Sequence, residues 1–212
     1  MSVEYTRRLL DFFLRLFAAA VRGLPSSRRL KPFCVRRSAR FARHRFDFTF
    51  NTRMAGIRWT MDAFPDLLTR HLLFEGIYQE DVILAIQNLA RKGDVVFDVG
   101  GHHGLMAIVA GRVVGPKGQV VSFEPNPWAR VELEKNLKLN KALNVCVVPL
   151  ALSDTAGEVP FFAQQGTASW NSSLFNHFIG EGYTIKELKV PADTMDAYVK
   201  CSGCVPKVIK ID

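Results

Sequence analysis

A short apolar run that ends in a glycine-rich turn is the first feature of the sequence that could support chemistry. Residues 95–99 read VVFDV, and Gly100, Gly101 and Gly104 follow before an apolar helical pattern begins. Glycines let a ligand approach the backbone, where N–H groups and the positive end of a helix dipole attract an anionic group. In a parallel sheet, nucleotides bind beyond the carboxyl ends of the strands. The pattern therefore predicts a nucleotide or nucleoside site at this turn.

Two residues of this turn argue against a dinucleotide. The fingerprint G-x-G-x-x-G ending at Gly104 needs a glycine at position 99, which is Val99. The strand also carries Asp98, whose carboxylate would repel a pyrophosphate but can hold a cationic amino group or its ordered water. S-adenosylmethionine has an ammonium, a sulfonium, one carboxylate and no phosphate, so it fits this charge pattern better. An NAD-dependent oxidoreductase remains the alternative.

Acidic residues also follow the next two apolar runs. Glu124 directly follows the apolar run VVSF, within VVSFEPN, and stands 20 positions after Gly104. A carboxylate there can accept hydrogen bonds from both ribose hydroxyls. His102 and Asn126 belong to the same two loops, and we count them with the cofactor-binding residues. The third run ends in ALSD at residues 151–154. There Asp154 can accept from an adenine amino group while Leu152 contacts the ring, or Asp154 can simply form a turn.

Strands and helices alternate around these residues. Apolar periodicity predicts strands at 94–99, 119–123, 144–150 and 207–211 and helices at 79–90, 105–114, 129–140 and 194–200. A strand pair is expected at 158–162 and 186–190, flanking a polar loop at 167–173. The first helix should bury Val82, Ile83, Ile86 and Leu89. This order predicts an α/β protein with a Rossmann-like, doubly wound and mostly parallel sheet, covered on both faces.

A basic arm precedes the domain, which we expect at residues 46–212. Up to residue 60 the chain has 14 Lys and Arg against three acids, whereas the remainder is slightly acidic. Between residues 5 and 24 an amphipathic helix is predicted from the apolar residues Tyr5, Leu9, Phe12, Phe13, Leu16, Phe17 and Ala20. A basic linker follows to residue 45, and then a short strand or hairpin at 46–59. The helix could pack against the domain or a partner, bind an anionic membrane at its periphery, or serve organelle targeting.

Composition narrows the class of protein. The chain is 48% hydrophobic and 23% charged, which is typical of a globular protein. Its four unevenly spaced cysteines do not suggest a secreted disulfide scaffold. Charged residues interrupt the most apolar stretch, so we expect no membrane span and no export signal, and a cytoplasmic location. Because the basic excess is confined to the arm, composition argues against nucleic acid as a partner.

Two residue pairs have spacings that can bind metals. His102 and His103 are adjacent in the glycine turn, but no third ligand is placed by spacing. Cys201 and Cys204 form a C-x-x-C pair without a second pair. We therefore expect loop hydrogen bonding from the histidines, incidental thiols at the cysteines, and no metal.

The series DVVFDVGGHHG, VVSFEPNP, ALSDTAGEVPFF, NSSL, TMDAY and KVIKID resembles the FkbM family of S-adenosylmethionine-dependent methyltransferases, over roughly residues 46–212. The resemblance implies a class I methyltransferase fold and methyl transfer, commonly to a hydroxyl of a sugar, a glycolipid or a polyketide-type metabolite. It also implies the roles of individual residues. The cofactor loop would be formed by Asp98, Gly100, Gly101 and Gly104, with Glu124 on the ribose and Ser153 and Asp154 flanking the adenine.

The end of the sequence departs from that family. Asp212 matches an acid near the methyl donor and acceptor, which makes it the candidate base or orienting residue. Family members usually continue from this position into a Val-Glu-Gly turn and further sheet elements. We therefore expect an incomplete sheet that lacks part of the acceptor pocket. An inactive cofactor-binding fragment or pseudoenzyme is the alternative that this departure leaves open. His102 stands where the family often has Asn.

Overall fold

The computed structural model describes residues 3–23, 33–35, 37, 49–52, 54, 57–60, 67–164 and 185–212. The chain divides into two compact units, Met1–Tyr78 and Gln79–Asp212. The predicted division at residues 45 and 46 falls outside the described residues and stays a prediction.

The described residues of the first unit include a long helix, a small hairpin and a shorter helix after the hairpin. These elements are α1 (Val3–Gly23), β1 (Thr49–Asn51), β2 (Arg58–Thr60) and α3 (Leu67–Phe74). β1 and β2 pair antiparallel, with Phe50 opposite Trp59. The indole of Trp59 is fully buried and donates a hydrogen bond from Nε1 to Thr69 Oγ1 at 3.0 Å. The predicted amphipathic helix and the hairpin are thus confirmed.

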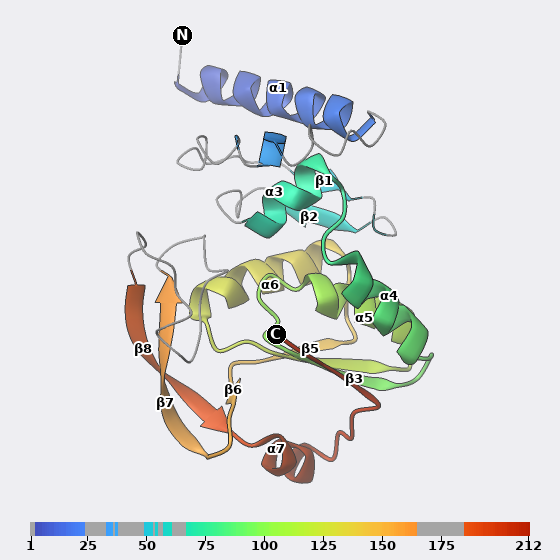
Figure 1. The fold of residues 1–212 in the computed structure, drawn as a ribbon, viewed down its shortest axis with the longest axis vertical. Helices are drawn as coiled ribbons and strands as arrows, with labels where there is room; N and C mark the ends of the chain where they lie inside the picture. The colour runs from blue at the N-terminus through green and yellow to red at the C-terminus, as the bar shows by residue number, and fades with distance from the viewer. Residues whose placement is uncertain are drawn as a thin grey trace. The chain divides into compact units, whose positions relative to one another are not determined.

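The second unit is built on a parallel four-stranded sheet (Figure 1). In spatial order its strands are β5 (Val145–Val148), β4 (Gln119–Phe123), β3 (Val95–Val99) and β9 (Val208–Ile211). From β3 the chain moves outward through β4 to β5, and it later returns to the other side of β3 as β9. The strand order therefore reverses between β3 and β9, which is the position where parallel α/β sheets open a ligand crevice.

Helices cover both faces of this sheet, as the apolar strands require. In Figure 1, α4 (Glu80–Leu89), α5 (Leu105–Val114) and α6 (Pro127–Leu139) lie above the sheet and α7 (Met195–Ser202) lies below it. On the α7 side, Phe97, Val121 and Phe123 are buried against Tyr198 and Val199. The predicted Rossmann-like α/β architecture is confirmed.

A second, three-stranded sheet follows β5. Its strands are β6 (Ala151–Leu152), β7 (Gly157–Gln164) and β8 (Ile185–Asp193), in the order β6-β8-β7. β7 and β8 are antiparallel, so the predicted strand pair is confirmed. The predicted strand at 144–150 is wrong in its extent, because the N–H of Leu150 bonds back to the Val148 carbonyl and the chain turns there into β6. The predicted polar loop at 167–173 lies outside the described residues.

Helix α4 corrects one core prediction. Ile83 and Ile86 are buried as expected, but Leu89 is 63% exposed. Ala90, directly after the helix, is buried in its place. Ile83, Ile86 and Ala90 are spaced by three and four residues and share one helical face, whereas Leu89 is rotated away from it.

Candidate functional site

The bend after β3 depends on glycine. Gly100, His102 and Gly104 all have positive φ angles (79°, 47° and 89°). A Cβ at Gly101 would lie 2.1 Å from Ser122 Oγ and 3.0 Å from Leu133 Cδ1. Any side chain at this position would push the bend away from β4 and α6. The glycines therefore bring the bend tightly against its neighbours.

Backbone N–H groups of the bend have partners within the protein. Those of Gly100 and Gly101 both donate to the Phe123 carbonyl at 3.0 Å. The N–H of Gly104 donates to Gly101 O at 2.8 Å, and that of His102 donates to Glu124 Oε2 at 2.7 Å. Such N–H groups were expected to attract an anionic ligand. In the structure three of these groups instead fasten the bend to Phe123 and Glu124 at the end of β4, and the N–H of Gly104 closes the bend on itself.

Glu124 follows β4 and faces the bend. Its carboxylate is 5% exposed, and while Oε2 accepts from His102, Oε1 accepts from the N–H of Asn126 at 2.8 Å. Burial raises the pKa of Glu124, whereas the two N–H groups and His103 act in the opposite direction. A carboxylate has about four lone-pair sites, so each oxygen keeps room for a further donor. The two sequence features that suggested a nucleoside site are in direct contact.

Asn126 fixes the chain that leaves Glu124. Its side chain is buried and caps α6, with Oδ1 accepting from the N–H of Trp128 at 3.0 Å. Pro127 occupies the first helical position, where no N–H is needed. Arg130 Nη1 donates to the carbonyls of Glu124 (2.9 Å) and Pro125 (2.7 Å). Together these contacts hold Glu124 in a single orientation.

A charged trio lies where β3 and β9 adjoin. Asp98 is 1% exposed, and its Oδ1 lies 3.1 Å from Lys210 Nζ. The same ammonium is 3.1 Å from Asp212 Oδ2 and 3.2 Å from Gly100 O. Ser122 Oγ donates to Asp98 Oδ2 at 3.3 Å. The cation expected beside Asp98 is therefore supplied by the chain itself.

Burial and charge act against each other within the trio. Burial raises the pKa of Asp98, and Lys210 and Ser122 oppose it. The carboxylates of Asp98 and Asp212 outweigh burial and raise the pKa of Lys210, which stays protonated at neutral pH. When both acids are ionised, the trio has one net negative charge. The side chain of Asp212 is 57% exposed, so this charge is presented to solvent through Asp212.

Lys210 belongs to the site but was not among the residues predicted from the sequence. A signal for it exists, because residues two apart on a strand share a face, and Lys210 stands two positions before Asp212. A lysine inside a short apolar strand also needs a partner, because lysine is almost never buried unpaired. Its pairing with Asp98 depends on the register between β3 and β9, which places Lys210 directly beside Asp98.

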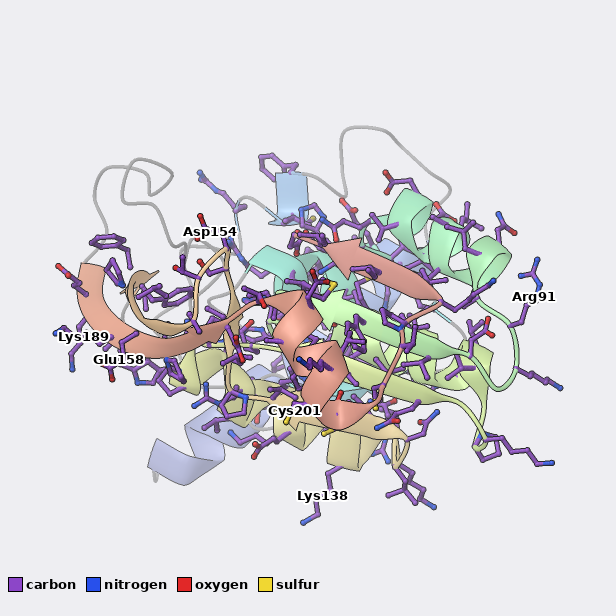
Figure 2. The ribbon with its side chains drawn as sticks, turned by 90° about the horizontal axis from the view of Figure 1, so that it is seen from below. Arg91, Lys138, Asp154, Glu158, Lys189 and Cys201 are labelled. Carbon is purple, nitrogen blue, oxygen red and sulfur yellow. The ribbon has the colours of Figure 1, made fainter. Side chains whose placement is uncertain are left out.

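Residues 152–154 form hydrogen bonds with neighbouring residues and with β8, and Leu152 packs in an apolar cluster. Ser153 bonds through its N–H to Asp193 O at 3.0 Å, and Asp154 accepts from Ser153 Oγ and Thr155 Oγ1 at 3.2 and 3.4 Å. Asp154 is exposed in the segment between β6 and β7 (Figure 2). Leu152 packs below the four-stranded sheet, against the cluster that contains Phe97 and Phe123. The turn interpretation of Asp154 accounts for its hydrogen bonds, and its proposed contact with adenine stays a prediction.

The pairs with metal-like spacing have other contacts. The rings of His102 and His103 stack at a centroid distance of 3.8 Å. Cys201 is an exposed residue of α7 (Figure 2), and Cys204 Sγ lies 3.6 Å from Gln119 Oε1. Over the described part of the chain, no three His, Cys, Asp or Glu residues group as metal ligands.

None of the helices in the described part of the chain has the length and apolar character needed to cross a bilayer.

Comparison with known proteins gives partial structural matches only. No protein-family model and no curated protein match the chain. A SAM-dependent O-methyltransferase from Thermotoga maritima is 17% identical over 51% of this chain and 51% of its own, with a TM-score of 0.36. P. horikoshii TYW2 in complex with MeSAdo is 17% identical over 61% and 52%, with a TM-score of 0.39. A protein-L-isoaspartate O-methyltransferase is 32% identical over 34% and 23%, with a TM-score of 0.31.

These matches span about half or less of each solved chain. Because their TM-scores are low, we infer function from the residues of the site itself.

Proposed function

We propose that the second unit binds S-adenosylmethionine beyond the carboxyl ends of β3, β4 and β9 and serves methyl transfer. The contact that carries this proposal is the 2.7 Å hydrogen bond from the His102 N–H to Glu124 Oε2. It joins the glycine bend after β3 to the acid after β4, at the carboxyl ends of these strands and next to the reversal of strand order between β3 and β9. That position is where nucleosides bind in parallel α/β sheets.

Glu124 is suited to hold a ribose. Two backbone N–H groups fix its carboxylate, and each oxygen retains acceptor capacity for a hydroxyl. A carboxylate held this rigidly loses little conformational entropy when a sugar binds, which favours affinity. This role is the one proposed for Glu124 from its spacing.

The charge of the trio favours a cationic nucleoside over a dinucleotide. Lys210 neutralises one of the two carboxylates, and the excess negative charge is presented by exposed Asp212. A sulfonium or ammonium group is attracted to such a site, whereas the pyrophosphate of NAD is repelled. This balance supports S-adenosylmethionine over the oxidoreductase alternative.

Methyl transfer also needs an acceptor that is aligned and deprotonated. S-adenosylmethionine, when bound, supplies an electrophilic methyl group. Asp212 is the exposed acid of the trio and would take the proton from an acceptor hydroxyl, while Lys210 orients its carboxylate at 3.1 Å. Alignment of the two reactants contributes the larger part of the rate in such a reaction. The FkbM resemblance points to a hydroxyl of a sugar, glycolipid or secondary metabolite as the acceptor.

Calorimetry with S-adenosylhomocysteine tests the proposal. Replacing Glu124 with Ala removes hydrogen bonds to a charged acceptor, so affinity should fall at least about tenfold. Glu134→Ala, which changes an exposed glutamate of α6, is the matched control and should bind like the parent. Circular dichroism of both variants checks that each is folded.

Three results would separate the possibilities. Unchanged affinity in Glu124→Ala would overturn the ribose role. A thermal shift with NAD but none with S-adenosylhomocysteine would support the oxidoreductase. Binding of S-adenosylhomocysteine without turnover of sugar, glycolipid or metabolite acceptors would support a cofactor-binding protein that lacks the enzyme activity.

A further inference from the structure

The apolar face of α1 is turned to solvent. Phe12, Phe13, Leu16 and Phe17 are each more than half exposed. They are spaced by one, three or four residues, so they form one continuous row on the helix. The rings of Phe12 and Phe13 also meet edge to face, at a centroid distance of 5.9 Å. Single exposed apolar side chains are common, but a contiguous row of four large ones marks an interaction surface.

Most of the packing contacts of α1 come from the face opposite this row. Ala18 and Val21 are buried, and Arg22 donates from Nη1 to Asn51 O in β1 at 2.7 Å. The Arg22 guanidinium also lies 5.9 Å from the centroid of the Phe50 ring. A helix that served only to cover a protein core would bury its large apolar side chains. Small residues, an arginine and one edge of Phe17, whose ring meets that of Phe74 in α3 at a centroid distance of 6.1 Å, attach α1 to its own unit. More than half of each side chain in the apolar row nevertheless stays exposed.

The charge of the arm indicates what covers this row. The first 60 residues hold 14 Lys and Arg but only three acids, and Arg15 is exposed one position before Leu16. A second copy would bring an equally basic arm against this one, which is electrostatically unfavourable. A surface with both negative charge and an apolar interior complements the arm, and an anionic lipid bilayer has both properties.

We propose that α1 lies in the plane of an anionic membrane surface, with Phe12, Phe13, Leu16 and Phe17 inserted among the lipids. Burial of this aromatic row supplies the apolar contribution, and the basic residues of the arm are attracted to the headgroups. Peripheral attachment of this kind does not depend on the methyltransferase proposal, since no residue of the second unit takes part.

Vesicle sedimentation of the full chain tests this surface. The protein should pellet with vesicles of phosphatidylcholine and phosphatidylserine but not with phosphatidylcholine alone, and high salt should release it. Phe13→Ser/Leu16→Ser should reduce the bound fraction at least about tenfold, because it removes much of the inserted apolar area. Leu84→Ser/Leu89→Ser changes two equally exposed apolar residues of α4 and should bind like the parent.

Other outcomes would overturn the proposal. One is absence of binding to phosphatidylserine vesicles at low salt, and another is equal binding by Phe13→Ser/Leu16→Ser and the parent. Gel filtration that shows a dimer of the parent and a monomer of this variant would assign the row to a second copy instead. Phe12→Ser, a single change in the same row, should weaken binding less than the double variant, and unaltered circular dichroism separates its effect from loss of folding.

Discussion

Replacing Lys210 with methionine tests the ion pair between β3 and β9. Methionine has a similar volume but no charge. Asp98 would lose its contact with Lys210 and keep the hydrogen bond from the Ser122 hydroxyl. Lys210 is 9% exposed and Asp98 1% exposed, so solvent cannot compensate for the lost ammonium. Breaking a buried pair by removing one partner costs about 3–5 kcal/mol. We expect the free energy of unfolding of the second unit to fall by about this amount at neutral pH.

This loss should shrink in acid. Burial raises the pKa of Asp98, and Lys210 is the largest of the contributions that oppose it. Without Lys210 the folded-state pKa rises further above that of the unfolded chain. A group whose pKa is higher in the folded state contributes stability that is complete at pH values below its pKa in the unfolded state. This contribution is lost as the pH rises through the pKa of the folded state. The variant should therefore approach the parent in stability as the pH falls toward the ordinary pKa of aspartate.

Urea unfolding followed by circular dichroism measures both effects. Lys138→Met, which alters a solvent-facing lysine of α6 (Figure 2), should change stability by no more than about 0.5 kcal/mol. Lys210→Met/Asp98→Asn should recover much of the loss, because neither position of the former ion pair then holds a charge. Equal costs for Lys210→Met and Lys138→Met, or no recovery in the double variant, would refute the buried ion pair.

Two further predictions concern the bend and the acid that it contacts. Gly101→Ala should lower the free energy of unfolding of the second unit by about 1–3 kcal/mol in urea, because the added Cβ would overlap Ser122 Oγ. Gly23→Ala is the control, since a Cβ there meets nothing within 4 Å and should leave the stability unchanged. Because burial raises the pKa of Glu124, its protonated form favours folding, and the parent should lose stability relative to Glu124→Gln as the pH rises above the ordinary pKa of glutamate. An unchanged difference between the two unfolding free energies as the pH rises from acid to neutral would contradict the raised pKa.

The order and type of the elements in the second unit follow from local sequence. Short apolar runs and helical periodicity fix β3, α5, β4 and α6 to within a few residues, since each pattern is set by neighbours in the chain. The contact between the bend and Glu124 was also predictable, because consecutive parallel strands joined by one helix bring their carboxyl ends together. Leu89 was misplaced because helical spacing alone does not say where the buried face is centred.

The alternation of strands and helices and the contact of Glu124 with the glycine bend thus follow from residues that are near one another in the chain. The cation that faces Asp98 does not, because Lys210 reaches Asp98 through the pairing of β3 with β9, two strands far apart in the chain. Tertiary structure also decided the orientation of α1. Periodicity defines an apolar row but not whether another part of the protein covers it, since burial depends on contacts between segments distant in sequence.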